Sequence, residues 1–205
     1  MIDRKHFFDS VRASLFKGKI SESQVQGMES ILLVWETGGY ADLRWLAYML
    51  GTTFHETAKR IDGVFTRTMQ PVEEDGRGRG RRYGKKVKRS GVPYTAPEQI
   101  YFGRGYVQLT WYENYENMGR LLAVDLLNNP DLALQPVIAC KIMFEGMTKG
   151  HSSFGDFTGV SLENYFNDKK EDWIGARKII NGLDCAELIA GYAKLFYAAI
   201  KIPLS

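Results

Sequence analysis

The chain lacks the features that mark membrane-spanning and metal-dependent proteins. No apolar run approaches the roughly 18 residues that are needed to cross a bilayer. The two cysteines, Cys140 and Cys185, lie in apolar helical patterns, so we expect both to be buried as small hydrophobic side chains. The three histidines have no ligand spacing with these cysteines. We therefore expect no metal ion and no organic cofactor.

The N-terminus also lacks an apolar signal core. Met1 to His6 lead into a charged amphipathic stretch that has no small-residue cleavage site. We expect a protein that stays in the cytoplasm of the producing cell and acts after release. Its 205 residues suffice for one domain with a sizeable core, and we expect residues 1–205 to form a single catalytic domain.

Acidic residues are missing from one segment. Eight of the 27 Lys and Arg residues lie between Arg77 and Arg89, where there is no Asp or Glu, so the rest of the chain is net negative. This run predicts either contact with an anionic surface or a solvated flap. A nucleic-acid-binding run would have aromatic residues interleaved for stacking, but only Tyr83 interrupts this one. We therefore expect no nucleic-acid partner.

The remaining patterns predict a mainly α-helical protein. Ser21 and Gln24 form a capping box before a helix that ends at Gly38, and Asp42 is expected to cap a second helix that ends near residues 57–60. Residues 62–107 are rich in Gly and Arg and predict irregular loops that can include one short hairpin. Further helices are predicted over residues 112–124, 136–149, 161–166, 172–180 and 186–201.

Glu56 stands on the last turn of an apolar helix. His55 and Glu56 begin like a zinc-protease motif, but Lys59 occupies the place of the second histidine, which excludes that interpretation. The helix C-terminus and partial burial both favour a protonated carboxyl, as a glycosidase acid requires. The alternative is an ordinary solvated glutamate at a helix end.

A second carboxylate is expected at the mouth of the loop region, where Glu73, Glu74 and Asp75 follow one another. Inverting glycosidases separate their two carboxyl groups by roughly 6.5–9.5 Å, which leaves room for the attacking water. One carboxylate on a helix and one on a loop are compatible with that spacing.

Four sequence blocks together resemble glycoside hydrolase family 19, the plant-type chitinases and their bacterial and phage relatives. Residues 101–111 (YFGRGYVQLTW) resemble the central motif of the family, and residues 54–57 (FHET) look like the end of its catalytic-acid helix. Residues 128–132 (NNPDL) and 179–182 (IING) are similar to a later turn and to a substrate-binding motif. The blocks follow the order of the family. Residues 69–71 (MQP) before the Gly/Arg-rich loop and residues 186–192 (AELIAGY) resemble the phage endolysin branch.

The resemblance implies a lysozyme-like α+β fold, with two lobes and a central cleft, and an inverting reaction. Glu56 matches the general acid, Glu74 is the best match for the general base with Glu73 as the alternative, and Thr110 matches a hydroxyl that holds the attacking water. The implied substrate-binding residues are His55, Tyr101, Gln108, Trp111, Asn114 and Asn181.

The last helix departs from the pattern of the family, and one residue of the central motif has a purely structural interpretation. Plant enzymes of the family carry an arginine in the last helix, where this chain has Leu188 and Ile189. Arg104 lies between two glycines. A buried side chain that stabilises the turn of the central motif explains its presence as well as a role in the site does.

The leading functional expectation is a monomeric endolysin that hydrolyses the glycan strands of peptidoglycan between N-acetylmuramic acid and N-acetylglucosamine. A chitinase with the same catalytic residues is the first alternative. A wall-binding protein that has lost catalysis is the second.

Overall fold

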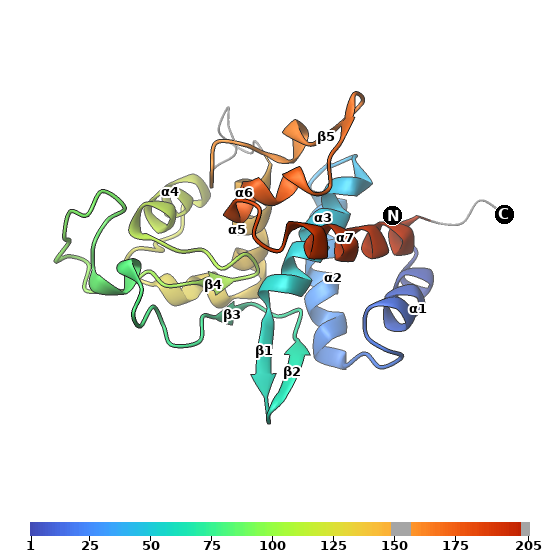
Figure 1. Cartoon of the computed structure of the whole chain (residues 1–205), viewed down its shortest axis with the longest axis horizontal. Coiled ribbons are helices and arrows are strands. Elements are labelled where there is room, and N and C mark those ends of the chain that lie inside the picture. The colour runs from blue at the N-terminus through green and yellow to red at the C-terminus, as the bar shows by residue number, and fades with distance from the viewer. Residues whose placement is uncertain (149–156, 202–205) are drawn as a thin grey trace.

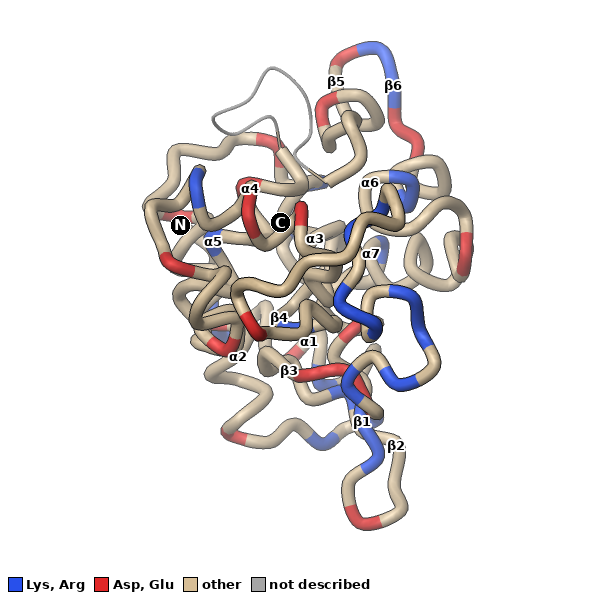
Figure 2. Tube along the Cα trace, turned by 90° about the vertical axis from the view of Figure 1, so that its left-hand side faces the viewer, with Lys and Arg blue, Asp and Glu red and all other residues tan. Residues whose placement is uncertain are grey.

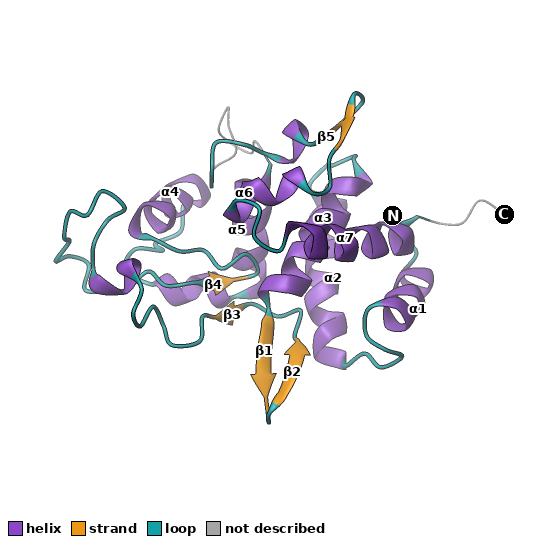
Figure 3. Cartoon of the chain, in the orientation of Figure 1, coloured by secondary structure: helices purple, strands orange, loops and turns teal. Residues whose placement is uncertain are grey.

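The computed structural model describes residues 1–148 and 157–201. About 51% of the described residues are helical and the strands are short, which confirms the predicted mainly α fold (Figures 1 and 3). The α-helices are α1 (Arg4–Ser14), α2 (Glu22–Thr37), α3 (Leu43–Glu56), α4 (Tyr112–Leu122), α5 (Pro136–Met147), α6 (Lys178–Asn181) and α7 (Ala186–Ile200). The strands are β1 (Ala58–Ile61), β2 (Val64–Arg67), β3 (Val72–Glu73), β4 (Arg104–Gly105), β5 (Phe166–Asn167) and β6 (Lys170–Glu171). Short 3₁₀ helices are formed by Arg82–Lys85, Pro130–Leu134, Leu162–Asn164 and Gly175–Arg177.

Helices α2 and α3 begin where side chains satisfy their first backbone amides. Ser21 and Gln24 form the predicted capping box, in which each side chain accepts a hydrogen bond from the other's backbone amide, at 3.2 and 2.8 Å. The Asp42 carboxylate accepts a hydrogen bond from the Arg44 amide at 3.0 Å. Helix α3 ends at Glu56, just before the predicted boundary. Residue 149, the predicted last residue of α5, lies outside the described residues.

The core is built around α3, which α7 crosses at close range (Figure 1). Every residue of α3 from Leu46 to Phe54 is buried. A Cβ on Gly51 would come within 2.8 Å of the backbone nitrogen of Ala193, so this crossing requires glycine. Because α3 is enclosed by the core, the backbone of Glu56 at its C-terminus is held in a fixed position. Within the described residues, every helix is too short or too polar to traverse a bilayer.

One strand pair is a local hairpin, and another joins segments that lie far apart in the sequence. Strands β1 and β2 form a hairpin through Asp62 and Gly63, whose positive φ angles suit a tight two-residue turn. This hairpin projects away from the helices (Figure 3). Strands β3 and β4 pair Glu73 with Arg104, so the central motif lies against the acidic run. Residues 62–107 are otherwise mostly irregular, as predicted.

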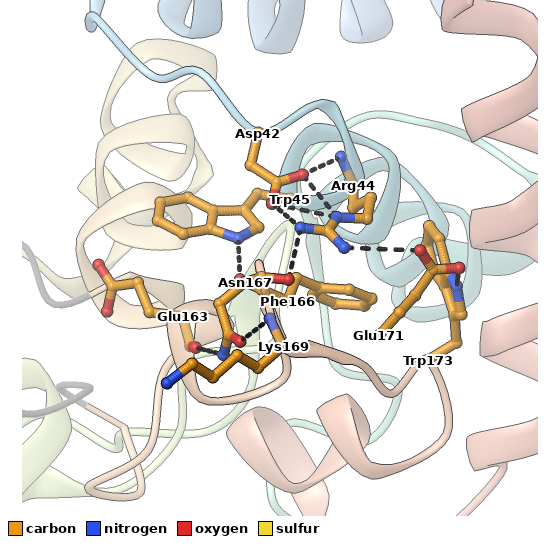
Figure 4. Close-up of polar contacts among 9 residues, drawn as sticks. All are labelled: Asp42, Arg44, Trp45, Glu163, Phe166, Asn167, Lys169, Glu171 and Trp173. Carbon is orange, nitrogen blue, oxygen red and sulfur yellow. Dashed lines mark hydrogen bonds and ion pairs between the residues drawn. The ribbon is translucent and has the colours of Figure 1, made fainter.

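A polar cluster fastens the β5–β6 hairpin to the start of α3 (Figure 4). The Arg44 guanidinium pairs with Asp42 at 2.5 Å and with Glu171 at 3.5 Å, and it donates to the Asn167 carbonyl at 3.3 Å. The Trp45 indole donates to the Phe166 carbonyl at 3.3 Å. These contacts fix the hairpin against α3, and the 3₁₀ helix Gly175–Arg177 follows it only a few residues later.

One of the two cysteines is placed as expected. Cys140 is buried in α5, and burial raises the pKa of its thiol to about 12. Cys185 is exposed, so the expectation that both are buried is wrong for this residue. The last helix was predicted to begin at residue 186, and Cys185 precedes α7 as its N-cap residue, with a φ of 55° and an exposed side chain.

Candidate active site

A cleft of about 460 Å³ lies beside the C-terminus of α3. One wall is the segment 107–111 with the first turn of α4, and another is formed around residues 157–158 and 180–181. The lining residues are Glu56, Tyr83, Arg89, Val107, Gln108, Leu109, Thr110, Trp111, Asn114, Phe157, Thr158, Ile180 and Asn181. Six of the predicted site residues are therefore brought together, namely Glu56, Gln108, Thr110, Trp111, Asn114 and Asn181.

Glu56 is held in the cleft by a buried arginine. Its Oε1 lies 2.7 Å from Nη1 of Arg177, and the two side chains are 15% and 2% exposed. Arg177 also donates from Nε to the carbonyl of Asp184 at 3.0 Å, which fixes the guanidinium from behind. Within residues 1–148 and 157–201, the other carboxyl oxygen of Glu56, Oε2, has no hydrogen-bond or ion-pair partner.

Glu74 follows β3 and is held at both carboxyl oxygens. Oε1 accepts a hydrogen bond from the Tyr83 hydroxyl at 2.7 Å, and Oε2 accepts one from the Gly103 amide at 3.1 Å. Burial and the neighbouring Glu74 carboxylate raise the pKa of Tyr83 to about 12. Glu74 is not itself a lining residue, but Tyr83 is, so the carboxylate lies directly behind the cleft wall.

Glu73 and Asp75 have other surroundings. Glu73 pairs with the exposed Arg77 at 2.8 Å, and Asp75 is mostly exposed at 3.9 Å from Lys59. Neither is a lining residue of the cleft. Of the three successive carboxylates, Glu74 is the one that contacts a residue of the cleft wall.

The central motif forms a wall of the cleft, and polar groups along this wall are linked by hydrogen bonds. Gln108 donates to the Val72 carbonyl at 2.9 Å, the Thr110 hydroxyl donates to the Gln108 carbonyl at 2.7 Å, and the Asn114 amide donates to the Thr110 carbonyl at 2.8 Å. Gln108 and Trp111 have positive φ angles of 53° and 79°, a conformation that costs on the order of 1–3 kcal/mol per residue. Strain of this kind persists only where the surroundings impose it, as at ligand sites.

Comparison with known proteins identifies the family. The profile described as Chitinase class I matches residues 34–154, which is more than half of the chain. The chain belongs to glycoside hydrolase family 19. Among curated relatives, this family 19 chain is 58% identical over 50 residues to Endochitinase 1 of Theobroma cacao, covering 24% of the chain and 16% of that relative. It is 39% identical over 103 residues to Endochitinase B of Nicotiana tabacum, covering 48% of the chain and 30% of that relative.

The fold of this family 19 chain is shared with solved bacterial chitinases. A bacterial family 19 chitinase aligns with a TM-score of 0.59 at 19% identity, covering 98% of this chain and 95% of its own. Chitinase C from Streptomyces griseus aligns with a TM-score of 0.59 at 19% identity, covering 97% and 76%. The expected lysozyme-like fold is thus confirmed. The matched segments span less than a third of the length of the two curated relatives above.

Two predicted substrate-binding residues of the family 19 chain lie outside the cleft lining. Tyr101 is 0% exposed, its hydroxyl donates to the Leu127 carbonyl at 2.8 Å, and its ring packs against Tyr115. The expectation that Tyr101 offers its ring to a sugar is therefore wrong, because the side chain belongs to the core. His55 is half-buried behind Glu56, and burial lowers its pKa. Its position gives no support to a sugar contact.

Arg104 belongs to the core as well, which favours its interpretation as a brace. Its guanidinium pairs with Asp131 at 2.8 Å, donates to the Phe102 carbonyl and stacks on the Phe102 ring, with the guanidinium carbon 3.6 Å from the ring centroid. This contact explains the conformation of the motif turn without a role in binding.

Sequence reasoning missed several residues of the site. Arg177 lies 121 positions after Glu56, and its only local signal is a cation set among apolar residues. Tyr83 was noticed only as an interruption of the basic run. Arg89 and Thr158 line the cleft without belonging to any of the four motifs.

Proposed function

We propose that this family 19 protein hydrolyses β-1,4 links between N-acetylated amino sugars by a single displacement. The observation that carries the proposal is Glu56, a carboxyl that lines the cleft and whose Oε1 is paired with Arg177 at 2.7 Å. In this mechanism Glu56 is the general acid that donates a proton to the departing glycosidic oxygen.

The general base in this proposal is Glu74. Water attacks the anomeric carbon once, from the side opposite the leaving oxygen, and Glu74 takes its proton. The hydrogen bonds from Tyr83 and Gly103 orient the carboxylate towards the cleft wall. Thr110 lies on that wall, and its hydroxyl is the group that we propose holds the attacking water. Trp111, Asn114 and Asn181 line the cleft, and we assign the contacts with the sugars and their acetamido groups to these side chains.

Two polymers fit this chemistry. The named curated relatives are endochitinases, which supports chitin. Arg89 on the cleft wall supports the anionic glycan of peptidoglycan, which is the substrate of a phage-type endolysin. Purified protein is to be incubated with chitin hexamer and, separately, with isolated peptidoglycan. Mass spectrometry of the reduced products then identifies the sugar at each new reducing end.

The Glu56→Gln variant tests the enzymatic proposal itself. Loss of a general acid lowers kcat by about 10²–10⁴-fold. Glutamine has the size of glutamate and keeps a side-chain oxygen that can face Arg177, so the variant should remain folded. Proton NMR of the first products of the unmodified protein should show the α-anomer, as inversion requires. If Glu56→Gln were as active as the unmodified protein on both polymers, the assignment of the acid would be rejected. If the unmodified protein released no product from either polymer, a wall-binding protein would be favoured.

A further inference from the structure

The basic segment between Arg77 and Arg89 is an ordered part of the cleft rim. Its chain folds back on itself so tightly that a Cβ on Gly84 would lie 2.0 Å from the Gly78 carbonyl oxygen. Tyr83 in the same turn reaches Glu74, and its ring packs edge-on against Trp111 with centroids 5.6 Å apart. Figure 2 shows several stretches of Lys and Arg in this part of the molecule, near the acidic residues at β3.

Two arginines of this loop lie against Trp111. The guanidinium carbons of Arg82 and Arg89 are each 5.8 Å from the centroid of the indole ring, within the range of a cation–π contact. Arg82 donates to the carbonyl of Arg89 at 3.2 Å, and the amide of Arg89 donates to Glu113 at 2.7 Å. The backbone of Arg89 is thus anchored, and its side chain lies on the cleft wall.

The charges of the cleft do not balance around Arg89. Glu56 and Arg89 are the charged side chains among the described lining residues, and Glu56 is already paired with Arg177 at 2.7 Å. Within the part of the chain that the structure describes, the guanidinium of Arg89 has no carboxylate partner. The Glu113 carboxylate contacts the backbone amide of Arg89 and forms no ion pair with its guanidinium, so the guanidinium beside the Trp111 ring is the cationic group that the described cleft lining offers to a ligand.

We propose that Arg89, supported by Arg82 on Trp111, binds a carboxylate carried by the substrate glycan. This inference rests on the proposed glycosidase function and narrows its substrate to an anionic polymer, such as the N-acetylmuramic acid strands of peptidoglycan with their lactyl carboxylates. The planar guanidinium fork matches a carboxylate with two parallel hydrogen bonds, and stacking on an indole holds the fork in place. A chitin chain is neutral and has no carboxylate to pair with the guanidinium of Arg89, which would then be solvated by water.

The test uses two substrates that differ only in charge. One is peptidoglycan glycan freed of its peptides, whose lactyl groups end in carboxylates, and the other is the same material with these groups converted to carboxamides. We measure kcat/KM on both for the unmodified protein, Arg89→Gln and Arg79→Gln. Arg79 lies in the same basic run, is exposed and does not line the cleft, so it controls for the loss of one charge.

The unmodified protein should prefer the carboxylate substrate, and Arg89→Gln should reduce that preference about tenfold, the low end expected for a charge-assisted hydrogen bond at an exposed rim. Arg79→Gln should retain the preference. Equal rates of the unmodified protein on both substrates, or an equal effect of the two substitutions, would overturn the inference. Hydrolysis of chitin hexamer alone would overturn it and leave the proposed function intact, whereas no hydrolysis of any of these glycans would refute the proposed function itself.

Discussion

Replacing Arg177 by methionine removes the cation that holds Glu56 and should destabilise the folded protein. Removal of one partner from a buried ion pair costs about 3–5 kcal/mol, because the remaining charge has no compensation. Glu56 is 15% exposed and faces an open cleft, so water can reach it and the low end of that range applies. The hydrogen bond to Asp184 is lost as well and adds about 1 kcal/mol. We expect a total loss of about 3–4 kcal/mol.

The assay is unfolding by urea and by heat at pH 7. For a chain of this size a loss of about 1 kcal/mol lowers Tm by roughly 2–4 °C, so Arg177→Met should melt about 6–16 °C below the unmodified protein. Lys178→Met is the matched control, because Lys178 is the exposed neighbour in sequence and should change stability by no more than about 0.5 kcal/mol.

A double-mutant cycle separates the ion pair from packing. In the Glu56→Gln background no bare carboxylate is left behind, so Arg177→Met should cost about 2 kcal/mol less there than in the unmodified protein. Strict additivity of the two substitutions, or a loss below about 1 kcal/mol for Arg177→Met alone, would refute the structural role assigned to this pair.

Three further outcomes are expected. Tyr83→Phe removes a hydrogen bond to the Glu74 carboxylate and should lower kcat about tenfold in steady-state kinetics, with little change in melting temperature. Gly84→Ala places a Cβ against the opposite arm of the basic loop and should open it, which limited trypsin digestion detects as faster cleavage between residues 77 and 89. Hydrogen bonding to Arg4 lowers the pKa of Glu36 to about 2, so this carboxylate stabilises the fold above its ordinary pKa near 4.5 and loses that effect as pH falls towards 2. Glu36→Gln should therefore lower Tm at pH 7 and change it little at pH 2.

Local sequence signals predicted the helical framework because their physical causes are local. The capping box at Ser21 and the N-cap at Asp42 act within one helical turn, so the sequence contains all that is needed to place the starts of α2 and α3. The end of α3 at Glu56 was also close to the prediction. Resemblance to the family, and not periodicity, supplied the roles of the residues on the opposite wall.

The sequence was insufficient where placement depends on contacts between distant segments. Tyr101 and Trp111 lie in one motif, yet Tyr101 enters the core beside Tyr115 whereas Trp111 lines the cleft. From the composition of the basic run, only two alternatives could be predicted, namely contact with an anionic surface or a solvated flap. Its order comes from contacts of Tyr83 with Glu74 and Trp111, which composition cannot show. Arg177 was missed for the same reason.

The position of the basic loop connects the proposed chemistry to the proposed specificity. Tyr83 and Arg89 lie six residues apart on this loop, one in contact with the proposed base and both against Trp111. A change that moves the whole loop, such as Gly84→Ala, should therefore alter the rate and the preference for a charged substrate together. Tyr83→Phe should alter the rate on both substrates equally, and Arg89→Gln should alter the preference. If these two variants changed rate and preference in the same proportion, the loop would act as one unit, and separate roles for Tyr83 and Arg89 would be untenable.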